Sequence, residues 1–265
     1  MRQHCTVALG GDGGDELFGG YAHYSRLLWI QQSLGFIPGY IRKLMAKTSE
    51  KILPLGFKGR NYMQGLDVDL NRGLPSIASL FDRTSRKRLL AGQSKIKVIA
   101  EDVWENRIPL RKDLLQRATQ MDFENYLPED ILVKVDRASM LNSLEVRAPF
   151  LDCRILEFAF GKVPSRFKAS TSEKKILPKK LAKRLLPSKF DIQRKQGFSI
   201  PIADWLKGGP FRELFWDTLS NADCLFDQAT VKSLLRGQGR AQNNGERLFS
   251  LVQFEIWKKI HKITL

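Results

Sequence analysis

One short apolar run constrains this chain most, because it stops abruptly in a glycine-rich, acidic loop. The run is Thr-Val-Ala-Leu at residues 6–9, and the loop is Gly-Gly-Asp-Gly-Gly-Asp-Glu at residues 10–16. This pattern predicts a buried strand that delivers a loop at its carboxyl end. Only five residues precede the run, whereas a parallel sheet needs several strands covered by helices. We therefore expect few strands here, with further sheet partners in sequence upstream.

Helical periodicity dominates the rest of the chain. Apolar spacing predicts one helix over residues 15–32 and another that starts after Ser76 and stops near Gly92. Pro128 is placed to open a helix, because its missing N–H costs nothing in a first turn. Further helices are predicted at residues 94–106, 111–125, 128–142, 151–160, 172–186, 211–220, 228–237 and 245–262. No internal repeat or linker is present, so we expect a single α/β, predominantly α-helical domain over residues 1–265.

The composition is that of a folded protein without a membrane partner. Of 265 residues, 43% are hydrophobic and 10% aromatic, which is enough for a substantial core. No apolar stretch is long enough for a spanning helix, and the N-terminus lacks the hydrophobic region of a signal peptide. The three cysteines are an odd number without metal-ligand spacing, which fits packing roles in a reducing compartment. We expect a cytoplasmic protein.

A strong excess of positive charge indicates a polyanionic partner. The chain has 44 lysines and arginines against 28 aspartates and glutamates, a net charge of +16. The segment from Lys162 to Lys195 alone has twelve basic and two acidic residues. Most of these cations fit a solvated helix face, while a few could meet phosphate groups. A basic nucleic-acid-binding protein is the competing class, but no nucleic-acid motif is present and the aromatic residues are not interleaved with the basic run.

The glycine-rich loop is the first place where the sequence indicates chemistry. Its four glycines allow a sharp turn and a close approach of backbone N–H groups to a ligand. Asp12, Asp15 and Glu16 would repel one another unless a cation lay among them, and Mg²⁺ prefers such carboxylate oxygens. The alternative is a solvated turn before a helix whose N-terminal dipole favours Asp15 and Glu16.

Three separated motifs resemble the glutamine-dependent asparagine synthetases, in the order found in that family. The first is Gly-Gly-Asp-Gly-Gly-Asp-Glu-Leu-Phe-Gly-Gly-Tyr at residues 10–21, where Gly10 replaces the usual serine. The second is Tyr-Leu-Pro-Glu-Asp-Ile-Leu-Val-Lys-Val-Asp-Arg-Ala-Ser-Met at residues 126–140, followed by Leu-Glu-Val-Arg-Ala-Pro-Phe-Leu-Asp at residues 144–152. The third is Gln-Arg-Lys-Gln-Gly-Phe-Ser-Ile-Pro at residues 193–201, preceded by Ser-Glu-Lys-Lys-Ile-Leu at residues 172–177.

The resemblance implies a partial adenine-nucleotide α-hydrolase-like domain that uses ATP and Mg²⁺. In the family the aspartate β-carboxylate attacks the α-phosphorus of ATP, giving β-aspartyl-AMP and pyrophosphate, and ammonia then displaces AMP. By this resemblance Asp15 binds the metal, and the backbone of Gly10 and Gly11 borders the AMP moiety. Asp12 orients or deprotonates the incoming ammonia, and Lys195 stabilises the leaving pyrophosphate.

Two more lysines are implied on the nucleotide side of the site. Lys134 belongs to the second motif, although its spacing also allows a plain helical ion pair with Asp130. Lys174 resembles a second family lysine, but Pro178 stands where an arginine is usual. The charges of residues 144–152 support the site in the family, and by themselves they also fit an ion-pair staple between two helices.

Two parts of the family's enzymes are not found in this sequence. It has no Ser-Gly-Gly-x-Asp-Ser pyrophosphate loop, and Cys5 is not followed by the glycine of an N-terminal glutaminase domain. We therefore expect a truncated synthetase domain from a larger reading frame. Its expected partners are aspartate and glutaminase-derived ammonia. The full-length protein is a candidate homodimer. The alternatives are an inactive remnant, a chain that works with a second chain, and a relative that amidates another carboxylate.

Overall fold

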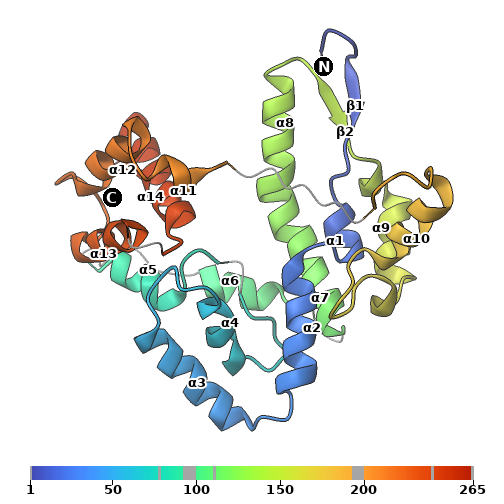
Figure 1. The fold of residues 1–265 in the computed structure, drawn as a ribbon, viewed down its shortest axis with the longest axis horizontal. Coiled ribbons are helices and arrows are strands. Elements are labelled where there is room, and N and C mark those ends of the chain that lie inside the picture. The colour runs from blue at the N-terminus through green and yellow to red at the C-terminus, as the bar shows by residue number, and fades with distance from the viewer. Residues whose placement is uncertain are drawn as a thin grey trace. The chain divides into compact units, whose positions relative to one another are not determined.

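The computed structural model describes residues 2–76, 79–91, 100–109, 112–192, 200–239 and 242–263. Helices predominate in this part of the chain (Figure 1). In chain order the elements are β1 (Val7–Leu9), α1 (Gly14–Phe18), α2 (Ala22–Leu34), α3 (Gly39–Ile52), α4 (Arg60–Gln64), η1 (Gly65–Asp67), α5 (Arg83–Leu89), α6 (Ala100–Arg107), α7 (Leu114–Met121), η2 (Asp122–Leu132), α8 (Val133–Met140), β2 (Glu145–Arg147), η3 (Pro149–Leu151), α9 (Cys153–Gly161), η4 (Ser165–Phe167), α10 (Ile176–Leu185), α11 (Ile202–Trp205), α12 (Pro210–Ser220), α13 (Gln228–Gly239) and α14 (Gly245–Ile260).

The chain divides into two compact units, each assembled from three segments. Unit 1 comprises Met1–Pro38, Val68–Leu74 and Glu105–Gln196, and unit 2 comprises Gly39–Asp67, Pro75–Trp104 and Gly197–Leu265. The first two motifs and the segment that precedes the third, residues 172–177, lie in unit 1. The single domain over residues 1–265 stays a prediction.

Unit 1 contains a small parallel sheet made by β1 and β2, which lie side by side in Figure 1. Val7 pairs with Glu145 and Leu9 with Arg147. The strand β1 was expected, but β2 was not, because its Glu-Val-Arg sequence lacks an apolar run. The expectation of a buried strand is wrong: Leu9 is 74% exposed. In the described part of the chain β1 has β2 as its one partner strand, and two short strands bury little surface.

The helix predicted over residues 15–32 is broken into α1 and α2. Gly19 adopts a left-handed conformation with φ +70° and ends α1, and the N–H of Gly20 donates to the carbonyl of Asp15. This is a glycine C-cap, which satisfies a free carbonyl at the helix end. Helix α2 then starts at Ala22, so the helical periodicity is interrupted between Phe18 and Ala22.

Helices α7, η2 and α8 follow one another without a gap (Figure 1). The prediction that Pro128 opens a new helix is wrong, because Pro128 lies inside η2, which is a π-helix. A proline inside a helix removes one N–H donor and crowds the preceding turn. The wider turn of a π-helix is one of the few ways to absorb such a residue without ending the helix.

The first core of unit 1 lies under the glycine-rich loop. Leu17 and Phe18 of α1 and Ala159 of α9 are buried together, and Phe150 and Phe123 pack against them. A second buried layer joins α2 to α7, through Tyr24 and Leu27 on one side. Helix α7 contributes Leu114, Leu115, Ala118 and Met121. Burial of these side chains fixes the loop between β1 and α2 to the rest of unit 1.

Unit 2 has an independent all-helical core. The predicted helices α12, α13 and α14 are confirmed within a few residues, whereas α3, α4 and α11 were not predicted. The helix expected after Ser76 starts only at Arg83, where Asp82 caps it. The buried core residues are Phe81, Leu89, Ile202, Leu206, Phe215, Leu219, Phe226, Val231, Leu234, Leu235, Leu248, Leu251 and Val252. No helix in the described ranges is both long and apolar enough to cross a membrane.

Candidate active site in unit 1

The glycine-rich loop follows β1 and packs on the second motif. The N–H of Gly10 donates to the carbonyl of Arg147 at 2.7 Å, so this group belongs to the sheet pairing. Gly13 has φ +86°, and a Cβ there would lie 2.4 Å from Leu151 Cδ2. A side chain at Gly13 would therefore be strained both by its backbone and by its neighbour. The structure thus brings the first and second motifs into contact.

Gly11 and Asp12 occupy the open part of this loop. Gly11 is exposed, and a Cβ built on it meets no heavy atom within 4 Å. Asp12 is half-buried, and its Oδ2 would lie 2.7 Å from a Cβ at Gly10. The serine usual in the family at position 10 would therefore need Asp12 to shift. The space beside Gly11 allows a ligand to approach the backbone closely.

Asp15 forms an ion pair with Lys175, and the two charged atoms are 2.9 Å apart. Asp15 is on α1, and Lys175 stands immediately before α10, where it has φ +53°. A lysine in this left-handed region is uncommon and costs conformational energy. The pair places the segment that precedes the third motif, residues 172–177, beside the glycine-rich loop.

Sequence reasoning pointed to Lys174, the residue before the one that pairs with Asp15. Lys174 is half-buried and adjacent to α10. The sequence alone does not show which of the two neighbouring lysines pairs with Asp15, because the pairing depends on the left-handed backbone at Lys175. The predicted role of Lys174 stays a prediction. Lys195 falls on residues 193–199, which lie outside the described part of the chain.

Glu16 is turned into the interior and does not join Asp12 and Asp15 in one carboxylate cluster. It is 1% exposed, and the hydroxyl of Tyr21 donates to its Oε1 at 2.5 Å. Burial raises the pKa of Glu16, and this outweighs the hydrogen bond from Tyr21. Burial and the nearby Glu16 carboxyl also raise the pKa of Tyr21. The expected repulsion between carboxylates is present, because Asp15 also raises the pKa of Glu16, but Glu16 is relieved by burial and by Tyr21 and not by a cation.

A second polar group was missed by sequence reasoning and lies where α2 meets η2. Asp122 accepts a hydrogen bond from the Tyr24 hydroxyl at 2.6 Å, and His23 Nε2 lies 2.9 Å from the same carboxylate oxygen. Tyr21 stacks on His23 with ring centroids 5.6 Å apart, and Tyr126 meets the Tyr21 ring edge-on at 5.9 Å. These contacts tie the first motif to the start of the second motif.

The charges of the second motif mostly serve local structure. Lys134 lies 3.9 Å from Asp130 across one helical turn, as the spacing predicted, and both side chains are more than half exposed. Arg147 pairs with Glu145 at 2.8 Å within β2, not across two helices. Asp152 caps α9, and hydrogen bonds from Arg154 lower its pKa to about 2. The alternative of an ion-pair staple between two helices is therefore not supported, because Glu145, Arg147 and Asp152 pair with residues two positions away.

The site offers a nucleotide an open backbone at Gly11 and a cation at Lys175, but no ready cluster of metal ligands. No group of three His, Cys, Asp or Glu residues in the described ranges is arranged to hold a metal ion. A single carboxylate does suffice for Mg²⁺ when phosphate oxygens and water fill the other positions. Asp15 would meet that requirement by exchanging its partner, the Lys175 ammonium, for the metal ion. These residues therefore fit a metal ion that arrives bound to phosphate groups.

Comparisons with known proteins agree on one family. The sequence model described as asparagine synthase matches residues 1–259. The chain is 30% identical over 271 residues to a Mycobacterium tuberculosis (strain H37Rv) protein assigned as a glutamine-hydrolysing asparagine synthetase, covering 98% of this chain and 40% of that protein. It is 28% identical over 266 residues to glutamine-hydrolysing asparagine synthetase 1 of Bacillus subtilis strain 168, covering 98% and 41%.

This chain therefore spans about 40% of the length of the curated relatives that it matches. No solved structure matches it. The family match extends over nearly the whole sequence and includes all three sequence motifs. The chain belongs to the asparagine synthase family.

Proposed function

We propose that this chain carries part of an ATP-dependent synthetase site that adenylates the β-carboxylate of aspartate and passes the acyl group to ammonia. The Asp15–Lys175 ion pair beside the open Gly11 backbone is the observation that supports this proposal most directly. In the proposed site this carboxylate would hold a metal and this ammonium would meet phosphate, beyond the carboxyl end of β1. Ligands of parallel α/β domains bind at that end of the strands.

The proposed reaction has two steps. An oxygen of the aspartate β-carboxylate bonds to the α-phosphorus of ATP while the bond from the α-phosphorus to the bridging oxygen breaks, which releases pyrophosphate. The ammonia nitrogen then bonds to the β-carbonyl carbon, AMP leaves with the former carboxylate oxygen, and a proton is lost from nitrogen. Mg²⁺, when bound with ATP, neutralises phosphate charge.

Residues of this chain have separate tasks in that scheme. Asp15 would hold the metal, and Gly10 and Gly11 would border the AMP moiety. Asp12 is proposed to orient ammonia or to accept its proton. Lys195 is proposed to stabilise pyrophosphate as it leaves, because electrostatic groups of this kind act on charge that develops in the transition state. Lys134 and Lys174 are proposed on the nucleotide side, and the geometry adds Lys175 to them.

An adenine-nucleotide α-hydrolase-like fold is part of the proposal. The parallel pairing of β1 with β2 and the helices on the chain fit such an α/β arrangement. The domain would be completed by the pyrophosphate loop, supplied by further sequence or by a second chain. Ammonia would come from a glutaminase domain in the same way.

The experiment is a paired measurement of Mg·ATP binding and of AMP and pyrophosphate release with aspartate and ammonium. We expect Lys195→Ala to lower the rate of AMP release on the order of hundreds-fold, since one electrostatic donor is worth about 3 to 4 kcal/mol. Lys189→Ala, at an exposed position of the same basic segment, is the matched control. Asp15→Asn should weaken Mg·ATP binding. Absence of Mg·ATP binding in the wild type would refute the proposal, while binding without turnover would identify a half-site.

The acyl substrate is the finer part of the proposal. The curated relatives are named for asparagine synthesis, which favours aspartate. A relative that amidates another carboxylate would release AMP with that acid and not with aspartate. Comparing pyrophosphate release with aspartate, glutamate and succinate therefore separates the two cases.

A further inference from the structure

We propose that unit 2 contains a binding site for a small organic oxyanion, in which the guanidinium of Arg88 recognises the anion. The site is a cavity of about 460 Å³, a size typical of small-molecule sites. Its lining residues all belong to unit 2, whereas the candidate active site lies in unit 1. The inference is therefore independent of the proposed function.

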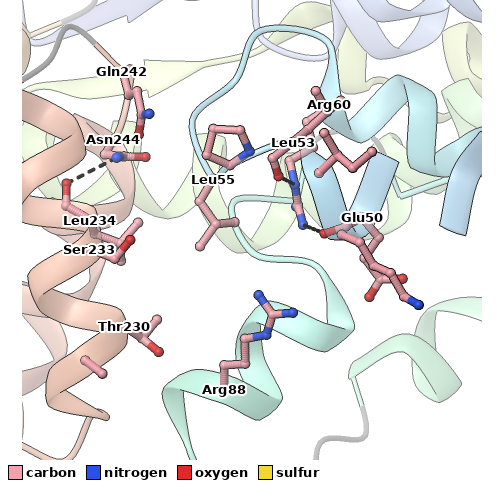
Figure 2. A pocket seen from close by; sticks show the side chains of 14 residues that line it. Glu50, Leu53, Leu55, Arg60, Arg88, Thr230, Ser233, Leu234, Gln242 and Asn244 are labelled. Atoms are coloured by element: carbon pink, nitrogen blue, oxygen red, sulfur yellow. Dashed lines mark hydrogen bonds between the residues drawn. The ribbon is translucent and has the colours of Figure 1, made fainter. Parts of the chain in front are cut away.

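Three parts of unit 2 form the cavity. One wall is the end of α3 and the loop that follows it, residues 50–55, and the opposite wall is α13 with Gln242 and Asn244. Arg88, in the last turn of α5, enters from below in Figure 2, and its guanidinium points up toward Leu55. Charged, hydroxyl and apolar side chains therefore face the same space.

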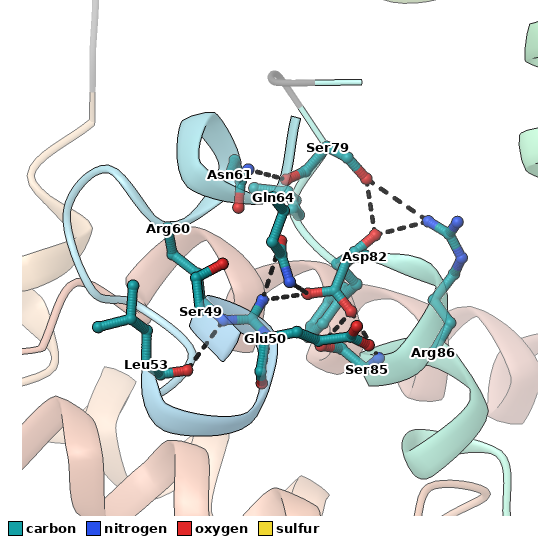
Figure 3. A network of polar contacts seen from close by, with 12 residues as sticks. Ser49, Glu50, Leu53, Arg60, Asn61, Gln64, Ser79, Asp82, Ser85 and Arg86 are labelled. Atoms are coloured by element: carbon teal, nitrogen blue, oxygen red, sulfur yellow. Dashed lines mark hydrogen bonds and ion pairs between the residues drawn. The ribbon is translucent and has the colours of Figure 1, made fainter. Parts of the chain in front are cut away.

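Arg60 also lines the cavity, but its charge is already neutralised by an ion pair. Its Nε donates to the carbonyl of Leu53 at 3.0 Å, and it pairs with Asp82 (Figure 3). It is only 3% exposed. Arg60 therefore fixes the loop that forms one wall, and Asp82 neutralises it.

Arg88 is different, because it is an exposed residue of the lining and its guanidinium has no ion pair or side-chain hydrogen bond with any described residue. The neighbouring Arg86, by contrast, donates to the carbonyl of Phe81 at 2.6 Å. The exposed Ser233 hydroxyl is likewise without a hydrogen bond among the described residues, while Thr230 donates to Asp227 at 2.7 Å and can only accept. An oxyanion that replaced water at Arg88 would therefore break no contact between protein groups.

The chemistry of the lining defines the ligand class. A guanidinium binds a carboxylate or a phosphate through two parallel hydrogen bonds, which gives Arg88 a preference for oxyanions. Lys51 and Arg88 outnumber Glu50, so the unneutralised charge of the lining is positive. Leu55 and Leu234 supply apolar surface for a carbon body.

Asn244 shapes the cavity wall but offers a ligand no acceptor. It is fully buried, and its Nδ2 donates to the carbonyl of Leu234 at 3.2 Å. Its Oδ1 is inaccessible and would lie 2.4 Å from a Cβ at Gly56, so this oxygen faces the Gly56 backbone. An organic oxyanion with an apolar body therefore matches the cavity best.

The test uses the whole chain with three probes: N-acetylleucine as its carboxylate, inorganic phosphate, and the uncharged N-acetylleucinamide. Binding is followed by calorimetry and by amide chemical shifts at low ionic strength. Arg88→Gln removes the charge at nearly constant length. Lys87→Gln removes a charge from the same helical turn at an exposed position that does not line the cavity, and serves as the matched control.

We expect saturable binding of N-acetylleucine that is at least about tenfold weaker in Arg88→Gln and changes by less than about twofold in Lys87→Gln. Binding of phosphate with the same dependence on Arg88 would support the oxyanion site and identify phosphate as a sufficient ligand. The proposal is overturned if neither anion saturates by about 10 mM, if N-acetylleucinamide binds equally well, or if Arg88→Gln has no effect.

Discussion

Gly20 shows how the absence of one side chain preserves the Asp15–Lys175 ion pair. A Cβ at Gly20 would lie 1.6 Å from Asp15 Oδ1 and 2.5 Å from Lys175 Cε. No backbone strain is involved, because Gly20 is not among the residues with positive φ. A side chain at this position would therefore displace one or both of the paired charges.

Gly20→Ala should lower the free energy of unfolding by about 1–3 kcal/mol, the usual cost of overpacking a filled site. Gly161→Ala is the control, because a Cβ there meets no heavy atom within 4 Å, and it should be nearly neutral. Urea denaturation of both variants measures the difference. Equal stabilities for the two variants would contradict the assigned packing.

Lys168 is a fully buried lysine inside the basic segment. Its ammonium nitrogen has no hydrogen-bond partner among the described residues and lies 4.7 Å from the centre of the Phe160 ring. Burial lowers the pKa of Lys168 to about 8, with the attraction of Asp113 opposing that effect. One of the cations expected on a solvated face is therefore part of the interior.

This lowered pKa predicts a pH-dependent stability. The unfolded lysine has a pKa of about 10.4, so the unfolded state binds more protons between pH 8 and 10.4, and the free energy of unfolding rises with pH in that window. Between pH 8 and pH 9.5 the wild type should gain about 1 to 2 kcal/mol relative to Lys168→Met. Lys162→Met, at an exposed lysine, should follow the wild type. Chemical denaturation at the two pH values decides, and parallel behaviour of Lys168→Met and wild type would contradict the burial of this amine.

At the scale of elements, two helices of unit 2 have the same cap but different surroundings. Asp82 caps α5 by accepting from the N–H and the hydroxyl of Ser85, and Asp227 accepts in the same way from Thr230 at the start of α13. Asp82 alone also pairs with the buried Arg60. Burial raises the pKa of Asp82, but the hydrogen bonds from Arg60 and Ser85 outweigh it, so the pKa lies below its usual value.

Asp82→Ala should therefore destabilise unit 2 by about 3–5 kcal/mol, because it leaves the Arg60 charge buried without its partner. Asp227→Ala removes only a cap and should cost about 1 kcal/mol. Thermal and urea unfolding of both variants give the comparison. A loss no larger for Asp82→Ala than for Asp227→Ala would mean that Arg60 finds another partner.

The elements also show what the sequence can and cannot predict. The long amphipathic helices α12, α13 and α14 were predictable, because their apolar spacing repeats over several turns. The break at Gly19 and the continuation through Pro128 were not, because a glycine cap and a π-turn depend on tertiary contacts. In the site, Asp15 lies in the first turn of α1 directly after the loop, and the choice of Lys175 as its partner depends on a left-handed turn that periodicity does not report.

Among the described residues, the two main buried clusters each stay within one unit, although the chain passes between the units several times. The buried cluster of unit 2 has no member from unit 1, and the cluster of Leu17, Phe18 and Ala159 has none from unit 2. Hydrophobic stabilisation comes from surface buried within a core, so each core should resist unfolding with its own free energy.

This separation predicts how a cavity mutation spreads through the molecule. Leu248 is fully buried in unit 2, and Leu248→Ala should cost about 2–5 kcal/mol in that core. Amide hydrogen exchange should then accelerate in α12, α13 and α14, while amides of α1, α7 and α9 keep their protection. Leu17→Ala, at an equally buried position of unit 1, should give the reverse pattern. A uniform loss of protection from either variant would show that the two cores unfold as one cooperative unit, and the five crossings of the chain between the units would then be the physical link that couples them.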